Sequence, residues 1–294
     1  MEVKILNLKR IYPTFVLSSL IFFGLSACTN VDTEVSKLEE KTKEIDNVVD
    51  VLTLASDATE NVKNYNIEMS LTQNMNLMGS DFSTSMNSNG HINLEPLIIH
   101  QTTLMETDEL KGEDKNNRSL ETEMYSNEDE IYIKDSATKN WSHSKGKDIR
   151  SLSSVQSVRD YGPDRRMEML EKIASDAVLT ENKELYVVTM ENTDAQGAKD
   201  IILENFDATF GEGEELKQAI GETIEIIDMK IEATFDKKTF LPLTAHIHLN
   251  LTFVVEGNTV NLKQNIDTAY SDFDKVENIK IPADVKNTAV EVEK

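Results

Sequence analysis

Two histidines, His246 and His248, lie two residues apart in a segment where polar and apolar residues alternate. On a strand this spacing places both imidazoles on the same side, where they could share a metal ion. The apolar positions around them are odd-numbered, however, so both histidines belong to the polar face. A zinc site needs three or four ligands, and no further ligand is in register with the pair. We therefore expect solvent-facing histidines, no metal and no cofactor.

Other catalytic chemistry has little support in the sequence. The acidic runs at 128–130 and 212–215 lack the alternating oxygen ligands and fixed glycine of an EF-hand loop, and solvated charge explains them better. There is no G-x-S-x-G nucleophile elbow. A hydrolase that uses paired carboxylates stays open, because nothing singles out two of the many acids. The leading expectation is a protein that is not an enzyme.

The single cysteine, Cys28, follows an export signal. Lys4, Lys9 and Arg10 precede an apolar run over 14–27 that is too short for a comfortable membrane span. Residues 25–28, Leu-Ser-Ala-Cys, resemble the lipobox of bacterial lipoproteins. The pattern predicts cleavage before Cys28 and acylation of its thiol with chains such as palmitate. The alternative is a free cysteine in an ordinary anchor.

Charge then limits the partners of the mature chain. The full sequence has 53 acids against 30 bases, a net charge of −23. Removing residues 1–27 takes away three bases and one acid, which leaves 27 − 52 = −25. Such a surface repels nucleic acid, and it repels an anionic leaflet as well. We therefore expect attachment to the extracytoplasmic face of the cell membrane through the lipid on Cys28 alone, since two acyl chains hold a protein firmly.

The segment after the cysteine predicts a tether and then a helix. Residues 28–44 are mostly polar, whereas apolar residues recur at helical spacing over 45–63. A coiled-coil partner is the alternative reading of this pattern, but the repeat is short and its first half polar.

From Tyr65 onward the apolar period changes to two, which indicates strands. Long strands are expected at 65–77, 82–94, 97–107, 228–235, 243–255 and 259–270, with shorter ones at 119–126, 130–134, 140–144 and 185–190. A helix is expected after Gly162-Pro163-Asp164, and Gly257-Asn258 is read as a hairpin turn. Strands of this length must twist and curl. The pattern predicts one α+β domain over 45–294, a long curved antiparallel sheet forming a half-open barrel with helices on its concave side.

Four segments carry a family resemblance. They are Lys63-Asn64-Tyr65, Glu130-Ile131-Tyr132-Ile133-Lys134 followed by Asn140-Trp141, the run from Phe235 to Pro242, and Ile279-Lys280-Ile281-Pro282. Together they resemble the LolA/LppX-like lipoprotein superfamily, and in particular an uncharacterised family of Gram-positive lipoproteins. The resemblance implies a curved sheet around helices, with an apolar interior that carries acyl chains in some members. It implies no catalytic residues.

Methionines in the first strands suit such an interior, because their side chains adapt to varied apolar partners. The residues expected to line a hydrophobic or lipid-like ligand are Met69, Leu71, Met86, Leu249 and Phe253. Ordinary core packing of the same residues stays open. So does a protein of another class, an interaction or sensor module that has a filled core and binds another envelope protein.

Overall fold

The computed structural model describes residues 45–77, 80–109, 118–135, 138–145, 162–191, 197–199, 201–203, 220–255 and 257–291. The predicted signal peptide, Cys28 and the predicted tether lie outside the described residues. Among the described residues, no helix is long and apolar enough to cross a membrane.

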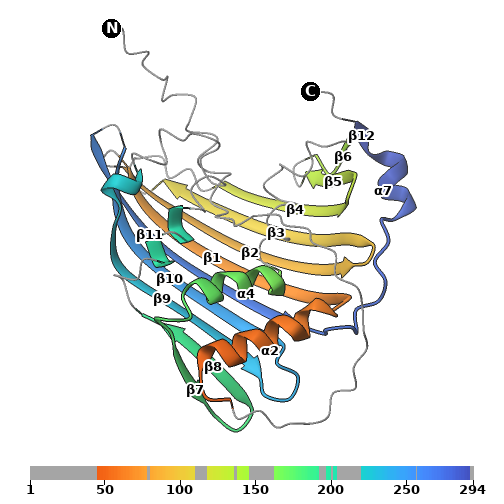
Figure 1. Cartoon of the computed structure of the whole chain (residues 1–294). Helices are drawn as coiled ribbons and strands as arrows, with labels where there is room; N and C mark the ends of the chain where they lie inside the picture. Colours follow the sequence, from red (N-terminus) through yellow and green to blue (C-terminus); the bar gives the residue numbers. More distant parts are fainter. Residues whose placement is uncertain are drawn as a thin grey trace, which may run out of the picture.

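One curved sheet of twelve strands dominates the described chain (Figure 1). The strands are β1 (Asn64–Leu77), β2 (Ser80–Leu94), β3 (Leu97–Glu109), β4 (Arg118–Asn127), β5 (Glu130–Asp135), β6 (Trp141–Lys145), β7 (Val178–Glu181), β8 (Leu185–Met190), β9 (Glu225–Asp236), β10 (Pro242–Val255), β11 (Asn258–Ser271) and β12 (Val290–Glu291). Their order in the sheet is β12-β6-β5-β4-β3-β2-β1-β11-β10-β9-β8-β7, which leaves β12 and β7 as edges. The sheet is therefore not closed.

The sheet joins two runs of antiparallel neighbours. β1 to β6 form one run and β7 to β11 the other, and β1 and β11 join them by pairing along eleven residues from Asn66↔Ser271 to Asn76↔Asn261. The predicted antiparallel sheet is correct except at one edge, where β12 pairs with β6 in parallel. This short strand and α7 (Ala283–Thr288) belong to a C-terminal segment that begins after β11, in the middle of the sheet, and ends at the edge next to β6 (Figure 1).

Alternation of buried and exposed residues defines two faces of the sheet. In β11, alternate residues from Val260 to Tyr270 are buried and those between them are more exposed. We call the face that carries the buried residues the inner face and the opposite one the outer face. The register places the odd-numbered residues of β1 and the even-numbered residues of β2 on the inner face as well.

Two helices pack on the inner face over β8–β11. In α2 (Val48–Glu60), the Asn47 side chain caps the helix by accepting a hydrogen bond from the Asp50 amide at 3.0 Å. In α4 (Pro163–Lys172), Pro163 occupies the first helical position, where its missing N–H costs nothing. Their buried side chains form a first cluster with β8–β11, and its members on the helices include Val51, Leu52, Met167 and Leu170.

A second cluster covers the inner face of β1–β5. Its buried members are Val62, Tyr65, Ile67, Met69, Leu71, Met86, Ile92, Leu97, Ile99, Met124, Ile131, Ile266 and Tyr270. All but Val62, which follows α2, lie on or directly beside strands of the sheet. The two clusters share the inner face and meet at the partly buried Ile247, and this division positions the candidate site.

Several elements differ from the sequence prediction. The strand β7 and the elements α7 and β12 were not predicted, because they are short and their residues are mostly exposed. The turn between β10 and β11 lies one residue earlier than predicted. Val255 pairs with Asn258, so Asn258 belongs to β11, while Gly257 adopts a φ of 78° that favours glycine.

Candidate functional site

The five residues predicted to line a ligand all lie on the inner face, and each side chain is buried, with 1–6% of its surface exposed. The structure does not bring them together in one group. Met69, Leu71 and Met86 belong to the second cluster, whereas Leu249 and Phe253 belong to the first. The predicted site therefore divides into two environments.

The environment of Leu249 and Phe253 is a helix-covered core. Both residues lie on β10, and the first cluster around them includes residues of α2 and α4. Leu249 is in register with Met229 of β9 and Gln264 of β11. Because helices already pack against this part of the sheet, these two residues fit ordinary core packing better than a ligand surface.

The environment of Met69, Leu71 and Met86 is built by strands. Leu71 pairs directly with Met86, and Met86 pairs in turn with Met105 of β3. Among the described residues, neither α2 nor α4 contributes to this second cluster. This half of the inner face offers apolar, adaptable side chains and is the candidate site.

Polar residues on the same half were missed by the sequence analysis. Thr84 and Ser88 of β2, Thr107 of β3, and Gln264 and Thr268 of β11 are all buried. Ser88 and Thr103 hydroxyls are 3.1 Å apart, and the Gln101 Nε2 donates to Ser88 Oγ at 2.6 Å. The signal was present as weak alternation in the third predicted strand, where polar residues take inward positions.

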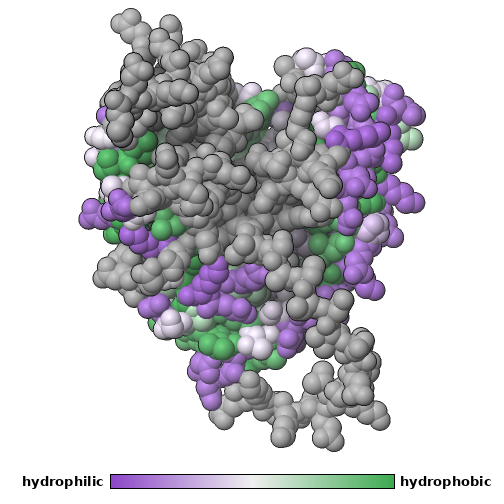
Figure 2. Space-filling model, turned by 45° about the horizontal axis from the view of Figure 1, so that its top comes forward, coloured by the Kyte–Doolittle hydropathy of each residue, from purple (hydrophilic) through white to green (hydrophobic). Residues whose placement is uncertain are grey.

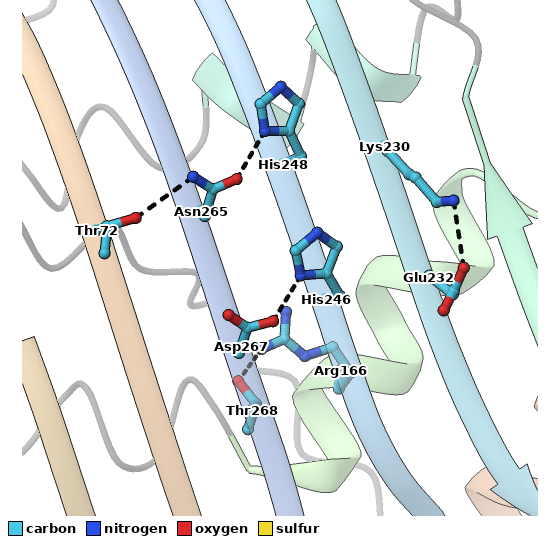
Figure 3. A network of polar contacts seen from close by, with 9 residues as sticks. All are labelled: Thr72, Arg166, Lys230, Glu232, His246, His248, Asn265, Asp267 and Thr268. Carbon is cyan, nitrogen blue, oxygen red and sulfur yellow. Dashed lines mark hydrogen bonds and ion pairs between the residues drawn. The ribbon is translucent and has the colours of Figure 1, made fainter.

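A buried arginine connects α4 to this face. Arg166 donates from Nη2 to Thr268 Oγ1 at 3.4 Å (Figure 3). Its Nη1 lies 3.8 Å from the Met169 sulfur. Thr268 is in register with Met69 on β1 and with Ala245 on β10. Arg166 thus lies close to the boundary between the two clusters.

Comparison with known proteins assigns the chain to a family. The model of the family of unknown function DUF6612 matches residues 47–290. The chain belongs to this family. No curated protein matches it.

Solved structures with a similar arrangement were also found for this DUF6612 chain. LprF from Mycobacterium bovis is 12% identical, with 80% of this chain and 97% of that chain covered and a TM-score of 0.37. A LolA superfamily protein, NE2245 from Nitrosomonas europaea, is 6% identical, with 82% and 97% covered and a TM-score of 0.22. A DUF1329 family protein from Desulfovibrio piger is 10% identical, with 78% and 92% covered and a TM-score of 0.23. These matches include a member of the LolA superfamily, which the sequence resembles.

The histidine pair lies on the outer face of this chain, as predicted (Figure 3). His246 donates from Nδ1 to Asp267 at 2.6 Å, and His248 donates from Nδ1 to Asn265 Oδ1 at 2.7 Å. The Nε2 of His248 lies 3.2 Å from Asp228. The described residues contain no group of three or more His, Cys, Asp or Glu side chains that could hold a metal ion. Both imidazoles instead bridge neighbouring strands.

A second outer-face group, also missed from the sequence, is a row of stacked rings across β2, β3 and β4. His91 and His100 ring centres are 6.0 Å apart, and those of His100 and Tyr125 are 4.2 Å apart. Burial lowers the pKa of His100, and the nearby His91 acts in the same direction, whereas Glu123 opposes it. Burial alone would raise the pKa of Glu123, but its hydrogen bond to Lys134 and the charge of that lysine lower it overall. Burial therefore opposes protonation of His100 within this row.

Exposed apolar side chains do not gather into a docking patch among the described residues. Figure 2 shows small hydrophobic areas between hydrophilic ones on the drawn face. The exposed large apolar residues are Val49, Leu94, Leu104, Val178, Ile227 and Val290, each on a different helix or strand. Single exposed apolar residues are normal on protein surfaces and indicate no partner.

Proposed function

We propose that this chain is a lipoprotein anchored to the extracytoplasmic face of the cell membrane through acyl chains on Cys28. It is not an enzyme, and it binds a hydrophobic or lipid-like ligand inside its half-open barrel. The inner face is the concave side, and α2 and α4 fill only the part of it over β8–β11. Residues 45–294 act as one domain, held away from the bilayer by the tether at 28–44.

One observation carries the proposal. The second cluster places Met69, Leu71, Met86 and Met124 on one strand-built apolar surface, and neither α2 nor α4 contributes to it. A sheet normally buries its apolar face against another layer. Methionine adapts to irregular apolar shapes, so this surface suits a flexible acyl chain. The ligand therefore lies over β1–β4, away from Leu249 and Phe253.

A second candidate, an envelope interaction or sensor module with no ligand, is favoured by the low exposure of the same residues. Met69, Leu71 and Met86 are only 1–6% exposed. That is also what a filled core would give. The two proposals differ in whether an apolar probe can reach the inner-face residues of β1–β4.

Photolabelling separates them. The full chain, in membrane vesicles of its host, is exposed to an alkane that carries a diazirine, irradiated, and digested for peptide mass spectrometry. Ligand binding predicts labels on β1–β4 inner-face residues such as Met86 that excess unlabelled alkane removes. Labels confined to the N-terminal peptide that carries Cys28, with none on these strands, would contradict it and favour the interaction module.

A further inference from the structure

Hydrogen-bonding residues form two rows on the inner face of β1–β4, on either side of an apolar row. Leu71, Met86 and Met105 make the apolar row, one residue from each of three neighbouring strands. Two residues from Met86 and Met105 in one direction along the strands, Ser88 of β2 pairs directly with Thr103 of β3. Two residues from Met86 and Met105 in the other direction, Thr84 of β2 pairs directly with Thr107 of β3.

The first of these rows is internally hydrogen-bonded. Ser88 Oγ lies 3.1 Å from Thr103 Oγ1 and accepts a hydrogen bond from Gln101 Nε2 at 2.6 Å. A hydroxyl has one donor and two acceptor positions. The group presents uncharged oxygen and nitrogen atoms next to Met86.

The second row contains a hydroxyl with no partner. Thr107 is 8% exposed, and its Oγ1 has no hydrogen-bond partner among the described residues. Its neighbour Thr84 is also buried, and the row continues to Gln73 and Gln264, whose amides are joined at 3.1 Å. A buried hydroxyl without a partner costs free energy that a core can avoid by using valine. The Thr107 hydroxyl is therefore free to bond to a ligand oxygen.

Another unpartnered inner-face hydroxyl, on Ser126, provides a contrast. Ser126 is buried, and its register partners are Ile99 on β3 and Ile131 on β5. It is a lone hydroxyl among apolar residues, whereas Thr107 extends a polar row. Only Thr107 lies beside other groups that could bind the same polar ligand.

We propose that the ligand is an uncharged amphiphile. Its acyl chain lies along Leu71, Met86 and Met105, and its hydroxyl or ester oxygens hydrogen-bond to Thr107 and Thr84. The hydrogen-bonding side chains of both rows beside Met86 are neutral, and the buried cation of Arg166 bonds instead to Thr268 on β11, two strands away from β2. The groups next to Met86 therefore favour a head group that carries hydroxyls over a carboxylate. This inference rests on the proposed function, because it requires a ligand over β1–β4.

Three diazirine probes with the same acyl chain test the inference on the full chain in vesicles: a monoacylglycerol, a fatty acid and an alkane. We expect competable labelling of β2 and β3 by the monoacylglycerol to exceed that by the other two. Thr107→Val should reduce the monoacylglycerol labelling about three- to tenfold, the effect of one lost hydrogen bond, and leave alkane labelling unchanged. It should not lower the thermal midpoint, because it removes an unpaired hydroxyl.

The matched control is Ser126→Ala, which should leave all three labelling yields unchanged. Equal labelling by the three probes, or preference for the fatty acid, would overturn the head-group inference while the proposed function stands. An unchanged monoacylglycerol yield in Thr107→Val would overturn it too. Absence of competable labelling on β1–β4 by all three probes would instead remove the proposed function itself.

Discussion

Leu71 on β1 and Met86 on β2 lie directly opposite each other on the inner face, and both side chains are almost completely buried. Cross-strand pairs of this kind are the units that stabilise a sheet. Here the pair also marks the middle of the candidate site. Leu249, which the sequence grouped with them, lies two strands away from β1 in the helix-covered cluster.

That division predicts different outcomes for matched polar substitutions. Leu249→Gln should lower the free energy of unfolding by several kcal/mol, because it loses apolar packing worth about 2–5 kcal/mol and buries an amide. Met86→Gln should reduce competable alkane labelling more than it reduces stability. Urea titration, followed by the fluorescence of the single Trp141, measures the stability of each variant. Equal destabilisation with unchanged labelling in both would favour the filled-core account.

Membrane attachment depends on one residue in this account. Cys28→Ala should abolish incorporation of a palmitate analogue and leave the precursor unprocessed or the protein released. The reason is that none of the described helices is long and apolar enough to cross a membrane, and the predicted mature chain is strongly acidic. Metabolic labelling followed by cell fractionation measures both effects. Label that persists on the Cys28→Ala chain would contradict the lipobox assignment.

Acidification should lower the stability of the folded chain through His100, the middle ring of the stacked row on β2, β3 and β4. Burial lowers the pKa of His100 in the folded chain, so the unfolded chain binds the proton first as pH falls below about 6.5. Stability should therefore decrease from about pH 6.5 down to the lowered pKa of His100, and His100→Gln should flatten that part of the profile. Urea titrations at half-unit pH steps measure it. If the wild-type stability instead increases as the pH falls from 6.5, the lowered pKa of His100 would be contradicted.

Glu123, the carboxylate beside His100, should affect the stability of the folded chain at a lower pH than His100 does. The pKa of Glu123 is lowered overall in the folded chain, so its stabilising contribution is present above its ordinary pKa, near 4.5, and is lost as pH falls through the lowered value. Glu123→Gln should remove this loss. Lys134→Met, which removes the main hydrogen-bond donor to Glu123, should shift it toward higher pH. Acid titrations of the wild type, Glu123→Gln and Lys134→Met, followed by circular dichroism, measure the pH at which each chain loses stability.

Close packing around Gly90 gives a prediction about the sheet itself. A Cβ at Gly90 would lie 2.9 Å from Cγ2 of Ile67, and 3.5 Å from Cδ1 of Ile92. Gly90→Ala should therefore cost about 1–3 kcal/mol through overpacking. The double variant with Ile67→Val tests the cause, because a smaller neighbour should reduce the cost of the alanine. Equal costs in both backgrounds would exclude this contact as the reason.

Local patterns predicted the strands well, because alternation and turn residues are properties of neighbouring positions. The predicted strands at 65–77 and 82–94 match β1 and β2 within two residues, and the predicted helix at 45–63 contains α2. The pairing of β1 with β11 and the parallel β12–β6 contact join residues far apart in sequence. No local pattern encodes them.

The same limit explains the candidate site. Met86 and Leu249 have the same apolar signature in sequence, and only the position of α2 and α4 distinguishes their surroundings. Thr107 lies in a strand whose alternation was weak, whereas Ser88 continued the alternation of its strand and gave no separate signal. Their importance appears only when the register places them on either side of Met86.

The central claim is that the chain carries a lipid-like ligand other than the acyl chains on Cys28. The most direct measurement is the molar ratio of non-covalently bound lipid to full-length chain. It is obtained by solvent extraction and mass spectrometry after detergent exchange, with Met86→Gln treated in parallel. We expect a defined species, close to one per chain, that is depleted in Met86→Gln. No lipid above the level of a detergent blank, or a mixture that mirrors the bulk membrane and is equal in both chains, would contradict the account.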